Sequence, residues 1–280
     1  MRFPNSARGW RSVVQPVTAL VLAALFIGVP LWLVLVTSAK PQGEAQKPNI
    51  NLPIVWQPIE NYTEAFIQGR ILQGLINSLI VVVPSTVLIL ILGAMAAWVF
   101  ARRTGRLNSV TYAFVISGLL LPPAVVTLVL LLRTMGLANT QAGLVATYVA
   151  IYLPLTVFLM TGFVRLIPIE LEEAARMDGA GPVRTFFQVI LPLLRPVIAT
   201  ATIMVVLFMW SDIFYAAFIL GGGNLATLPL NLFQVASAQL FQNNWHLVFA
   251  YIVMMSLPMI TIFVVAQRRI ISGVTSGAVK

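Results

Sequence analysis

The stretch from residue 71 to residue 101 reads ILQGLINSLIVVVPSTVLILILGAMAAWVFA and lies between Arg70 and Arg102 without a charged residue. A helix that crosses the hydrocarbon core of a bilayer needs about 20 predominantly apolar residues. The run is continuous and does not alternate between polar and apolar residues. Because backbone polar groups in hydrocarbon must be paired within the chain, this pattern predicts a spanning helix and not a barrel strand.

The composition of the whole chain agrees with a membrane protein. Of the 280 residues, 59% are hydrophobic and 9% are charged, and the mean hydropathy is +0.94. A soluble domain carries about 25% charged residues. The net charge of +9 is spread over short clusters between uncharged runs, which argues against a nucleic-acid partner. Cysteine is absent and His246 is the single histidine, which excludes thiolate sites and histidine-pair metal sites.

Outward from the first stretch, further uncharged runs predict an all-α polytopic protein that forms one transmembrane domain over residues 1–280. The six predicted spans are Val17–Thr37, Leu79–Val99, Val110–Leu132, Leu144–Phe163, Pro196–Leu220 and Leu247–Ala266. The first run also resembles a secretory signal with a cleavage site near Ala39, but its length favours an uncleaved span. A cytoplasmic loop over about 165–192 and a cytoplasmic tail over 267–280 complete the predicted layout.

The basic residues set the predicted orientation. Six spans place both termini on one side of the membrane, where 13 of the 17 basic residues fall. The other side holds Lys40, Lys47, Arg70 and Arg133. Loops rich in lysine and arginine stay in the cytoplasm, so both termini are predicted to be cytoplasmic.

On the outer side, residues 60–66 predict a short helix at the membrane surface. Trp56, Tyr62 and Phe66 are its predicted anchors at headgroup level, since aromatic residues favour the interface.

The predicted loop between spans four and five carries the most information. Pro168 and the acidic residues Glu170, Glu172 and Glu173 suit the first turn of a helix. Gly179 and Gly181 can end that helix and Pro182 can begin another, which predicts a helix–turn–helix. An acidic cluster is repelled by an anionic leaflet, so we expect the loop to bind a protein partner.

This loop resembles a signature of the membrane subunits of binding-protein-dependent ATP-binding-cassette (ABC) importers. In that signature Glu-Ala-Ala is followed after three residues by Gly, and after nine more by Ile-x-Leu-Pro. Here Glu173–Ala175 and Gly179 have the same spacing, and Val189–Pro192 follows with valine in place of isoleucine.

Further segments resemble the carbohydrate permeases of the maltose-transporter type, and their second (MalG-like) subunit in particular. They are Asn77-Ser78, Gly136–Thr140, Trp210–Phe214, Thr227–Pro229 and the tail Gln267–Lys280. One departure is Ser211, where that branch usually has asparagine.

The resemblance implies a type I importer fold and three groups of contact residues. A coupling helix would bind an ATPase subunit through Glu172, Glu173, Ala174, Ala175, Arg176, Asp178, Gly179 and Pro192. The tail would also reach the ATPases, through Gly273, Thr275, Gly277 and Lys280. An extracytoplasmic solute-binding protein would contact Gly221, Gly222, Gly223, Asn224 and Thr227. The implied partners are a second permease subunit, two ATPase copies, the binding protein and the lipid bilayer.

The residues themselves favour an external energy source. The lysines Lys40, Lys47 and Lys280 are not part of a Gly-Lys-Ser/Thr sequence, so no Walker A loop is present. Asp212, toward the outer end of the fifth predicted span, is the one acidic residue in any predicted span, whereas ion-coupled carriers depend on intramembrane carboxylates or histidines. We therefore expect a non-catalytic subunit without a cofactor of its own, in which a partner ATPase binds ATP and magnesium.

Several alternatives remain open at this stage. The same importer class could carry glycerol phosphate, a polyamine, a metal chelate or another small solute. A secondary carrier, a channel or a membrane enzyme lacks support in the titratable residues. The aromatic residues near Asp212 are interpreted as packing, namely Tyr148, Tyr152, Trp210, Phe214 and Tyr215.

Overall fold

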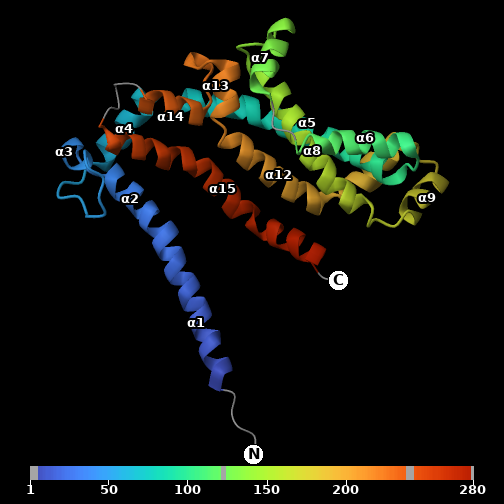
Figure 1. Ribbon diagram of the computed structural model, residues 1–280, viewed down its shortest axis with the longest axis horizontal. Coiled ribbons are helices and arrows are strands. Elements are labelled where there is room, and N and C mark those ends of the chain that lie inside the picture. Colours follow the sequence, from blue (N-terminus) through green and yellow to red (C-terminus); the bar gives the residue numbers. More distant parts are fainter. Residues whose placement is uncertain (1–5, 121–123, 238–242, 279–280) are drawn as a thin grey trace, which may run out of the picture. The chain divides into compact units, whose positions relative to one another are not determined.

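The computed structural model describes residues 6–120, 124–237 and 243–278, and every regular element in these ranges is a helix (Figure 1). The chain divides into two compact units. Unit 1 comprises Met1–Ile71 and Leu232–Ser256, and unit 2 comprises Leu72–Asn231 and Leu257–Lys280. Each unit is described by itself.

Unit 1 begins with a long apolar helix. Helix α1 (Ser6–Ala23) continues through a π-helical turn, η1 (Ala24–Gly28), into α2 (Val29–Ser38). Within Val14–Ser38, the most apolar 18-residue window has a mean hydropathy of 2.7, and 6% of that window is buried within the chain. Its length and composition agree with the predicted first span, and its exposed surface is suited to lipid.

The remainder of unit 1 packs around α4 (Pro58–Gln68), which confirms the predicted short helix after span one. A small core joins Ala65 of α4 to Leu247 and Ala250 of α15 (Trp245–Ala278). Tyr62 packs against this core, and its hydroxyl lies 3.1 Å from the Ser38 hydroxyl. Tyr62 is half-buried and supports the packing of unit 1, and its role as an anchor at headgroup level stays a prediction.

Two further spanning helices, α5 (Ile71–Arg102) and α8 (Gln141–Val164), lie side by side in unit 2 (Figure 1). A Cβ atom at Gly93 of α5 would lie 2.7 Å from the Thr156 side chain of α8. The two backbones can thus approach closely because Gly93 has no side chain. Both helices contain the spans predicted there.

The predicted third and fifth spans are not continuous helices. Within 110–132 the structure has α6 (Arg106–Ser117) and α7 (Val125–Thr134), and residues 121–123 between them lie outside the described residues. Pro122 and Pro123 have no backbone N–H to donate, which is a physical reason for a break near them.

Within 196–220, α12 (Arg195–Trp210) ends before α13 (Phe214–Leu220) begins. Asp212 accepts hydrogen bonds from the backbone N–H groups of Tyr215 and Ala216 and so begins a new helix. Helix α12 is also bent by 75° from the preceding helical segment Pro182–Leu193. Among the described residues four helices are long and apolar enough to span a membrane, or five if the bent pair is one span. The count of six is not confirmed.

Candidate functional site

The signature loop folds as a helical hairpin, which we call the α9 hairpin (residues 168–193). It consists of α9 (Glu170–Met177), α10 (Pro182–Thr185), a π-helical turn η2 (Phe186–Ile190) and α11 (Leu191–Leu193). Gly179 has φ +79°, a left-handed conformation that favours glycine, and its N–H donates to the Arg176 carbonyl at 3.0 Å. Pro182 is in the first turn of α10. The helix–turn–helix prediction is confirmed.

A hydrophobic core fixes the base of the hairpin to the spanning helices of unit 2. Phe186 and Ile190 of the hairpin are buried together with Ala97 of α5 and Val164 of α8. Leu194, directly after the hairpin, is in the same core and leads into α12. Because close-packed cores transmit displacement and do not absorb it, a force on the hairpin would pass to α5 and α8.

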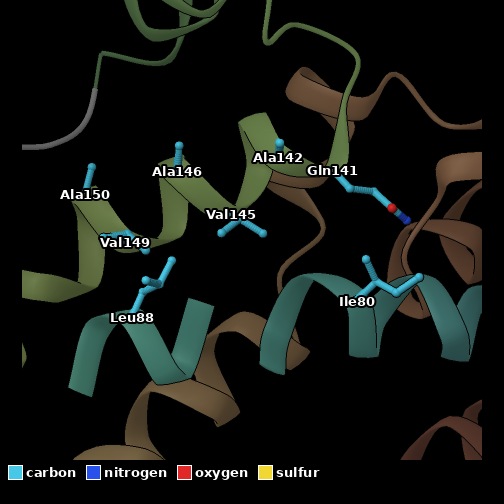
Figure 2. A pocket seen from close by; sticks show the side chains of 8 residues that line it. All are labelled: Ile80, Leu88, Gln141, Ala142, Val145, Ala146, Val149 and Ala150. Carbon is cyan, nitrogen blue, oxygen red and sulfur yellow. The ribbon is translucent and has the colours of Figure 1, made fainter. Parts of the chain in front are cut away.

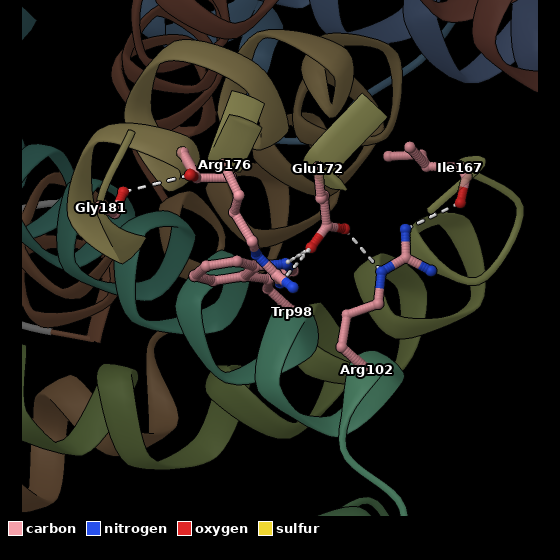
Figure 3. A network of polar contacts seen from close by, with 7 residues as sticks. Trp98, Arg102, Ile167, Glu172, Arg176 and Gly181 are labelled. Carbon is pink, nitrogen blue, oxygen red and sulfur yellow. Dashed lines mark hydrogen bonds and ion pairs between the residues drawn. The ribbon is translucent and has the colours of Figure 1, made fainter. Parts of the chain in front are cut away.

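The side chain of Glu172 connects α9 to the end of α5 (Figure 3). One carboxylate oxygen accepts a hydrogen bond from Arg102 Nε at 2.6 Å, and the other accepts one from Trp98 Nε1 at 3.0 Å. Arg102 also donates to the Ile167 carbonyl at 2.7 Å. Arg176 Nη2 lies 3.7 Å from Glu172 Oε2, but the Arg176 side chain is 59% exposed, so water screens the attraction between the two charges.

The contacts of Glu172 with Trp98 and Arg102, which we call the Glu172 anchor, are buried, so their energetics differ from those of a surface ion pair. The side chain of Glu172 is 0% exposed and that of Arg102 is 17% exposed. A buried carboxylate is tolerated when its oxygens are hydrogen-bonded and an opposite charge is near, as they are here. The geometry makes Glu172 a positioning residue that holds α9 in place.

The predicted coupling residues fall into three groups in the structure. Glu172 is buried, so its carboxylate is not available to a partner protein. Ala175 and Pro192 are half-buried. The exposed members are Glu173, Ala174, Arg176, Asp178 and Gly179.

Sequence reasoning had placed Met177 on the face of the loop that could enter a partner's groove, but it missed Trp98, Arg102 and Val183. Trp98 and Arg102 complete the anchor, and the only signal for them was a basic residue in the last turn of α5. Met177 and Val183 are 88% and 72% exposed, so the hairpin presents apolar side chains beside its charges. A groove of about 510 Å³ lies along α10 and the start of η2, lined in part by Val183 and Phe187.

The predicted binding-protein loop is fastened to the first half of α5. The side-chain amide of Asn77 donates to the carbonyls of Asn224 and Ala226 at 2.8 and 3.0 Å, and Ser78 Oγ accepts from the Leu228 N–H at 2.8 Å. Thr227 is 4% exposed, which leaves its side chain unavailable for direct contact. Gly221, Gly223 and Asn224 are exposed, and Gly222 is half-buried.

Three of the four predicted tail residues lie in the last helix. Gly273, Thr275 and Gly277 lie in α15, and Lys280 lies outside the described residues.

The Asp212 carboxylate, which lies within the fifth predicted span, is already hydrogen-bonded within the chain. Asp212 accepts from the buried Tyr148 hydroxyl at 2.8 Å, in addition to the two backbone N–H groups of α13. Tyr152 stacks on Phe208 with ring centroids 5.9 Å apart. These contacts agree with the interpretation of this aromatic group as packing. Across the part of the chain that the structure describes, no cluster of acidic, histidine or cysteine side chains is suited to a metal ion.

An apolar groove of about 660 Å³ lies between α5 and α8 (Figure 2). Val145 and Val149 of α8 point toward α5, and Gln141 is the one polar residue among the eight that line the groove. The Gln141 side-chain amide donates to Asn77 at 3.0 Å. A hydroxyl-rich solute needs several hydrogen-bonding partners, so the chemistry of this groove suits hydrocarbon and not such a solute.

Comparison with known proteins places these features in a family. The family described as "binding-protein-dependent transport system inner membrane component" matches residues 89–276, which include the α9 hairpin. The melibiose/raffinose/stachyose import permease protein MelC of Bacillus subtilis is 38% identical over 274 residues, with 96% of each chain covered. The diacetylchitobiose uptake system permease protein NgcG of Streptomyces coelicolor is 36% identical and covers 92% of this chain and 86% of its own.

The trehalose transport system permease protein SugB of Mycobacterium tuberculosis is 34% identical and covers 79% of this chain and 81% of its own. The fold is also that of a chain in the crystal structure of a bacterial ABC transporter involved in the import of the acidic polysaccharide alginate. That chain has a TM-score of 0.82 at 21% identity, with 96% of this chain and 99% of that chain covered. The chain therefore belongs to the inner-membrane components of binding-protein-dependent transport systems, the non-catalytic permease subunits of ABC importers.

Proposed function

We propose that this chain forms half of the translocation pathway for a carbohydrate that an extracytoplasmic binding protein delivers. The support is the similarity over most of the chain to permeases that are named for oligosaccharide or disaccharide uptake. Glycerol phosphate, a polyamine or another small solute is the alternative within the same importer class. Solute binding to the cognate binding protein separates these possibilities.

The single observation that carries the coupling role is the division of α9 into a buried side and an exposed side. Glu172 is held inward by α5, while Glu173, Ala174 and Met177 are exposed on a short acidic helix. A short helix with small and apolar side chains fits a groove on a partner protein. We assign this exposed side to the contact with an ATPase subunit, and Glu172 to the orientation of that side.

Movement of the ATPase subunits would then act on the hairpin as on a rigid lever. ATP-driven closure displaces α9, and the Glu172–Arg102 pair with the core beneath it carries the displacement to α5 and α8. Rigid-body movement of packed helices is an established way to switch between two states of a protein. In this scheme the pathway alternates between inward-facing and outward-facing states.

The proposed topology retains six spans with both termini in the cytoplasm. Helices α6 and α7 together supply the third span, and α12 with α13 supplies the fifth. The excess of 13 basic residues over 4 supports this orientation. Since the chain has no cysteine, single cysteines at Arg106 and Lys47 would report the two sides through their reaction with an impermeant thiol reagent. Reaction of both from the same side would reject the topology.

The proposed assembly contains a second permease subunit, two ATPase copies and one binding protein. The tail residues of α15 would add a second contact with the ATPases. The exposed residues Gly221, Gly223 and Asn224 would contact the binding protein, and the fastening by Asn77 keeps that loop in a defined conformation.

Site-specific photocrosslinking tests the coupling assignment. A photoreactive amino acid at Met177, which is 88% exposed on the hairpin, should yield an adduct with the ATPase subunit in membranes that contain the whole transporter. The matched control is Leu107, which is 79% exposed on α6 and should yield no such adduct. An ATPase adduct at Leu107 and none at Met177 would reject the assignment. Accumulation of solute by the purified chain alone in liposomes would reject an external ATPase altogether.

A further inference from the structure

The segment that follows span one in unit 1 exposes apolar side chains outside any spanning helix. Residues 48–59 contain no charged residue, although Lys47 and Glu60 flank them. Six of their apolar side chains are between 52% and 88% exposed, namely Ile50, Leu52, Ile54, Val55, Trp56 and Ile59. Exposed apolar side chains gathered within one short segment mark an interaction with protein or lipid.

Three hydrogen bonds to the backbone of this apolar segment hold it close to the last part of α2 and the residues just after it. The indole N–H of Trp32 donates to the Ile50 carbonyl at 3.0 Å. The N–H of Ile54 donates to the Glu44 carboxylate at 3.1 Å, and the N–H of Gln57 donates to the Ala39 carbonyl at 2.9 Å. The segment therefore has a defined path and returns along the helix that it has just left.

Lys40 fixes the turn that sends the segment back. Its side chain is 1% exposed, and its ammonium group donates to the carbonyl and to the side-chain oxygen of Asn49 at 2.9 and 2.8 Å. Burial lowers the pKa of Lys40, and the nearby Glu44 opposes that shift. Asn61 supports the same turn, because its side-chain amide donates to the carbonyls of Ser38 and Lys40.

The Trp32 hydrogen bond gives the depth of the segment. Trp32 precedes the end of α2 at Ser38 by six residues, which corresponds to about 9 Å along the helix axis. Ile50 is thus held beside the last part of span one and not beyond it. The segment has no regular secondary structure before α4, and unpaired backbone groups are not tolerated in hydrocarbon, so it must lie at the boundary of headgroups and acyl chains. Tryptophan is enriched at that level of membrane proteins, and Trp32 and Trp56 both belong to this part of the chain.

We propose that residues 50–59 form a lipid anchor, in which the exposed apolar side chains insert into the leaflet around the end of span one. The depth set by Trp32 and the absence of charge from 48 to 59 favour phospholipid over a water-soluble binding protein. The anchor would hold the packed part of unit 1 at a constant height while the permease changes state.

Nitroxide labels measure this directly, since the chain has no cysteine to remove. One variant carries Ile54→Cys, the most exposed position of the anchor, and the matched control carries Gln46→Cys, an exposed polar position before it. Each is labelled in the assembled transporter, with unreactive partner subunits, in nanodiscs of phosphatidylcholine and phosphatidylglycerol. Collision rates with oxygen, which partitions into lipid, and with a water-soluble nickel chelate are then compared.

We expect the ratio of oxygen to nickel collisions to exceed unity at position 54 and to be below unity at position 46, with or without the binding protein. A ratio below unity at position 54 would overturn the proposal. Loss of nickel access at position 54 upon addition of the purified binding protein, and not before, would overturn it in favour of a protein-docking surface. Normal solute uptake by both labelled transporters confirms that the substitutions leave the fold intact.

Discussion

Replacing Glu172 with alanine would remove the carboxylate that connects α9 to α5. Arg102 would keep the Ile167 carbonyl as a partner, but the Trp98 N–H and the Arg102 Nε–H would lose theirs. Removal of one member of a buried ion pair costs roughly 3–5 kcal/mol. Arg102 is 17% exposed and partly reached by water, so the lower end, about 3 kcal/mol, applies.

A loss of this size changes how often α9 leaves its place. About 1.4 kcal/mol corresponds to a factor of ten, so detachment of α9 should become roughly 100-fold more frequent. Hydrogen exchange of the α9 backbone should accelerate by a similar factor. Uptake should fall strongly while ATP hydrolysis by the assembled transporter becomes less dependent on the binding protein, because the contact between ATPase and permease is no longer held rigidly.

The design includes controls for charge and for folding. Glu170→Gln removes a carboxylate from the exposed start of the same helix and should leave exchange and uptake nearly unchanged. The double variant Glu172→Gln with Arg102→Met should be less damaged than Arg102→Met alone, because no charge then remains buried without its partner. Equal hydrogen-exchange rates of α9 in Glu172→Ala and in the unmodified chain would refute the role of Glu172 in holding α9 against α5.

Three further predictions concern other parts of the chain. Gly179→Leu places a branched side chain at φ +79°, which costs about 1–2 kcal/mol and should abolish uptake while membrane insertion persists. The control Gly181→Leu, at an ordinary φ with open space around it, should retain uptake. Equal loss of uptake in both variants would contradict this reasoning. Asn77→Ala removes the side-chain donor of the Ala226 carbonyl, at about 1–3 kcal/mol, while the Asn224 carbonyl keeps the Gln73 amide as a donor. The substitution should weaken stimulation by the binding protein without lowering basal ATP hydrolysis, and unchanged stimulation would show that the loop needs no fastening. Because burial lowers the pKa of Lys40 in the folded chain, the unfolded chain binds more protons at this residue, so stability should rise as the pH increases from the lowered pKa toward 10.5. Thermal unfolding of Lys40→Met should lack that rise. Identical pH profiles of the two chains would contradict this prediction.

Local patterns in the sequence were sufficient for the elements that depend on near neighbours. The long uncharged runs gave the helices α5, α8 and α15, because a helix in lipid satisfies its own backbone groups and needs only length and apolar composition. The α9 hairpin was likewise predictable, since Gly179 and Pro182 act through their own backbone preferences.

The broken spans show where local patterns were insufficient. Apolar composition over 110–132 and 196–220 resembled continuous spans, but composition does not record where a helix is interrupted. Asp212 accepts hydrogen bonds from the N–H groups of Tyr215 and Ala216 at the start of α13, and the distant Tyr148 hydroxyl donates to the same carboxylate. The cap of α13 is local, but the bond that holds the capping carboxylate depends on tertiary packing.

The sequence by itself determined that this chain is a helical membrane permease with an acidic hairpin, because both follow from hydrophobic runs and from a signature of fixed spacing. Only the tertiary structure decided that Glu172 is buried and Glu173 exposed, since adjacent carboxylates are equivalent until Trp98 and Arg102 arrive from a helix some 70 residues earlier. The same holds for Thr227, whose burial depends on the distant start of α5. Composition sets which solvent a segment prefers, but long-range packing sets which side chain faces that solvent.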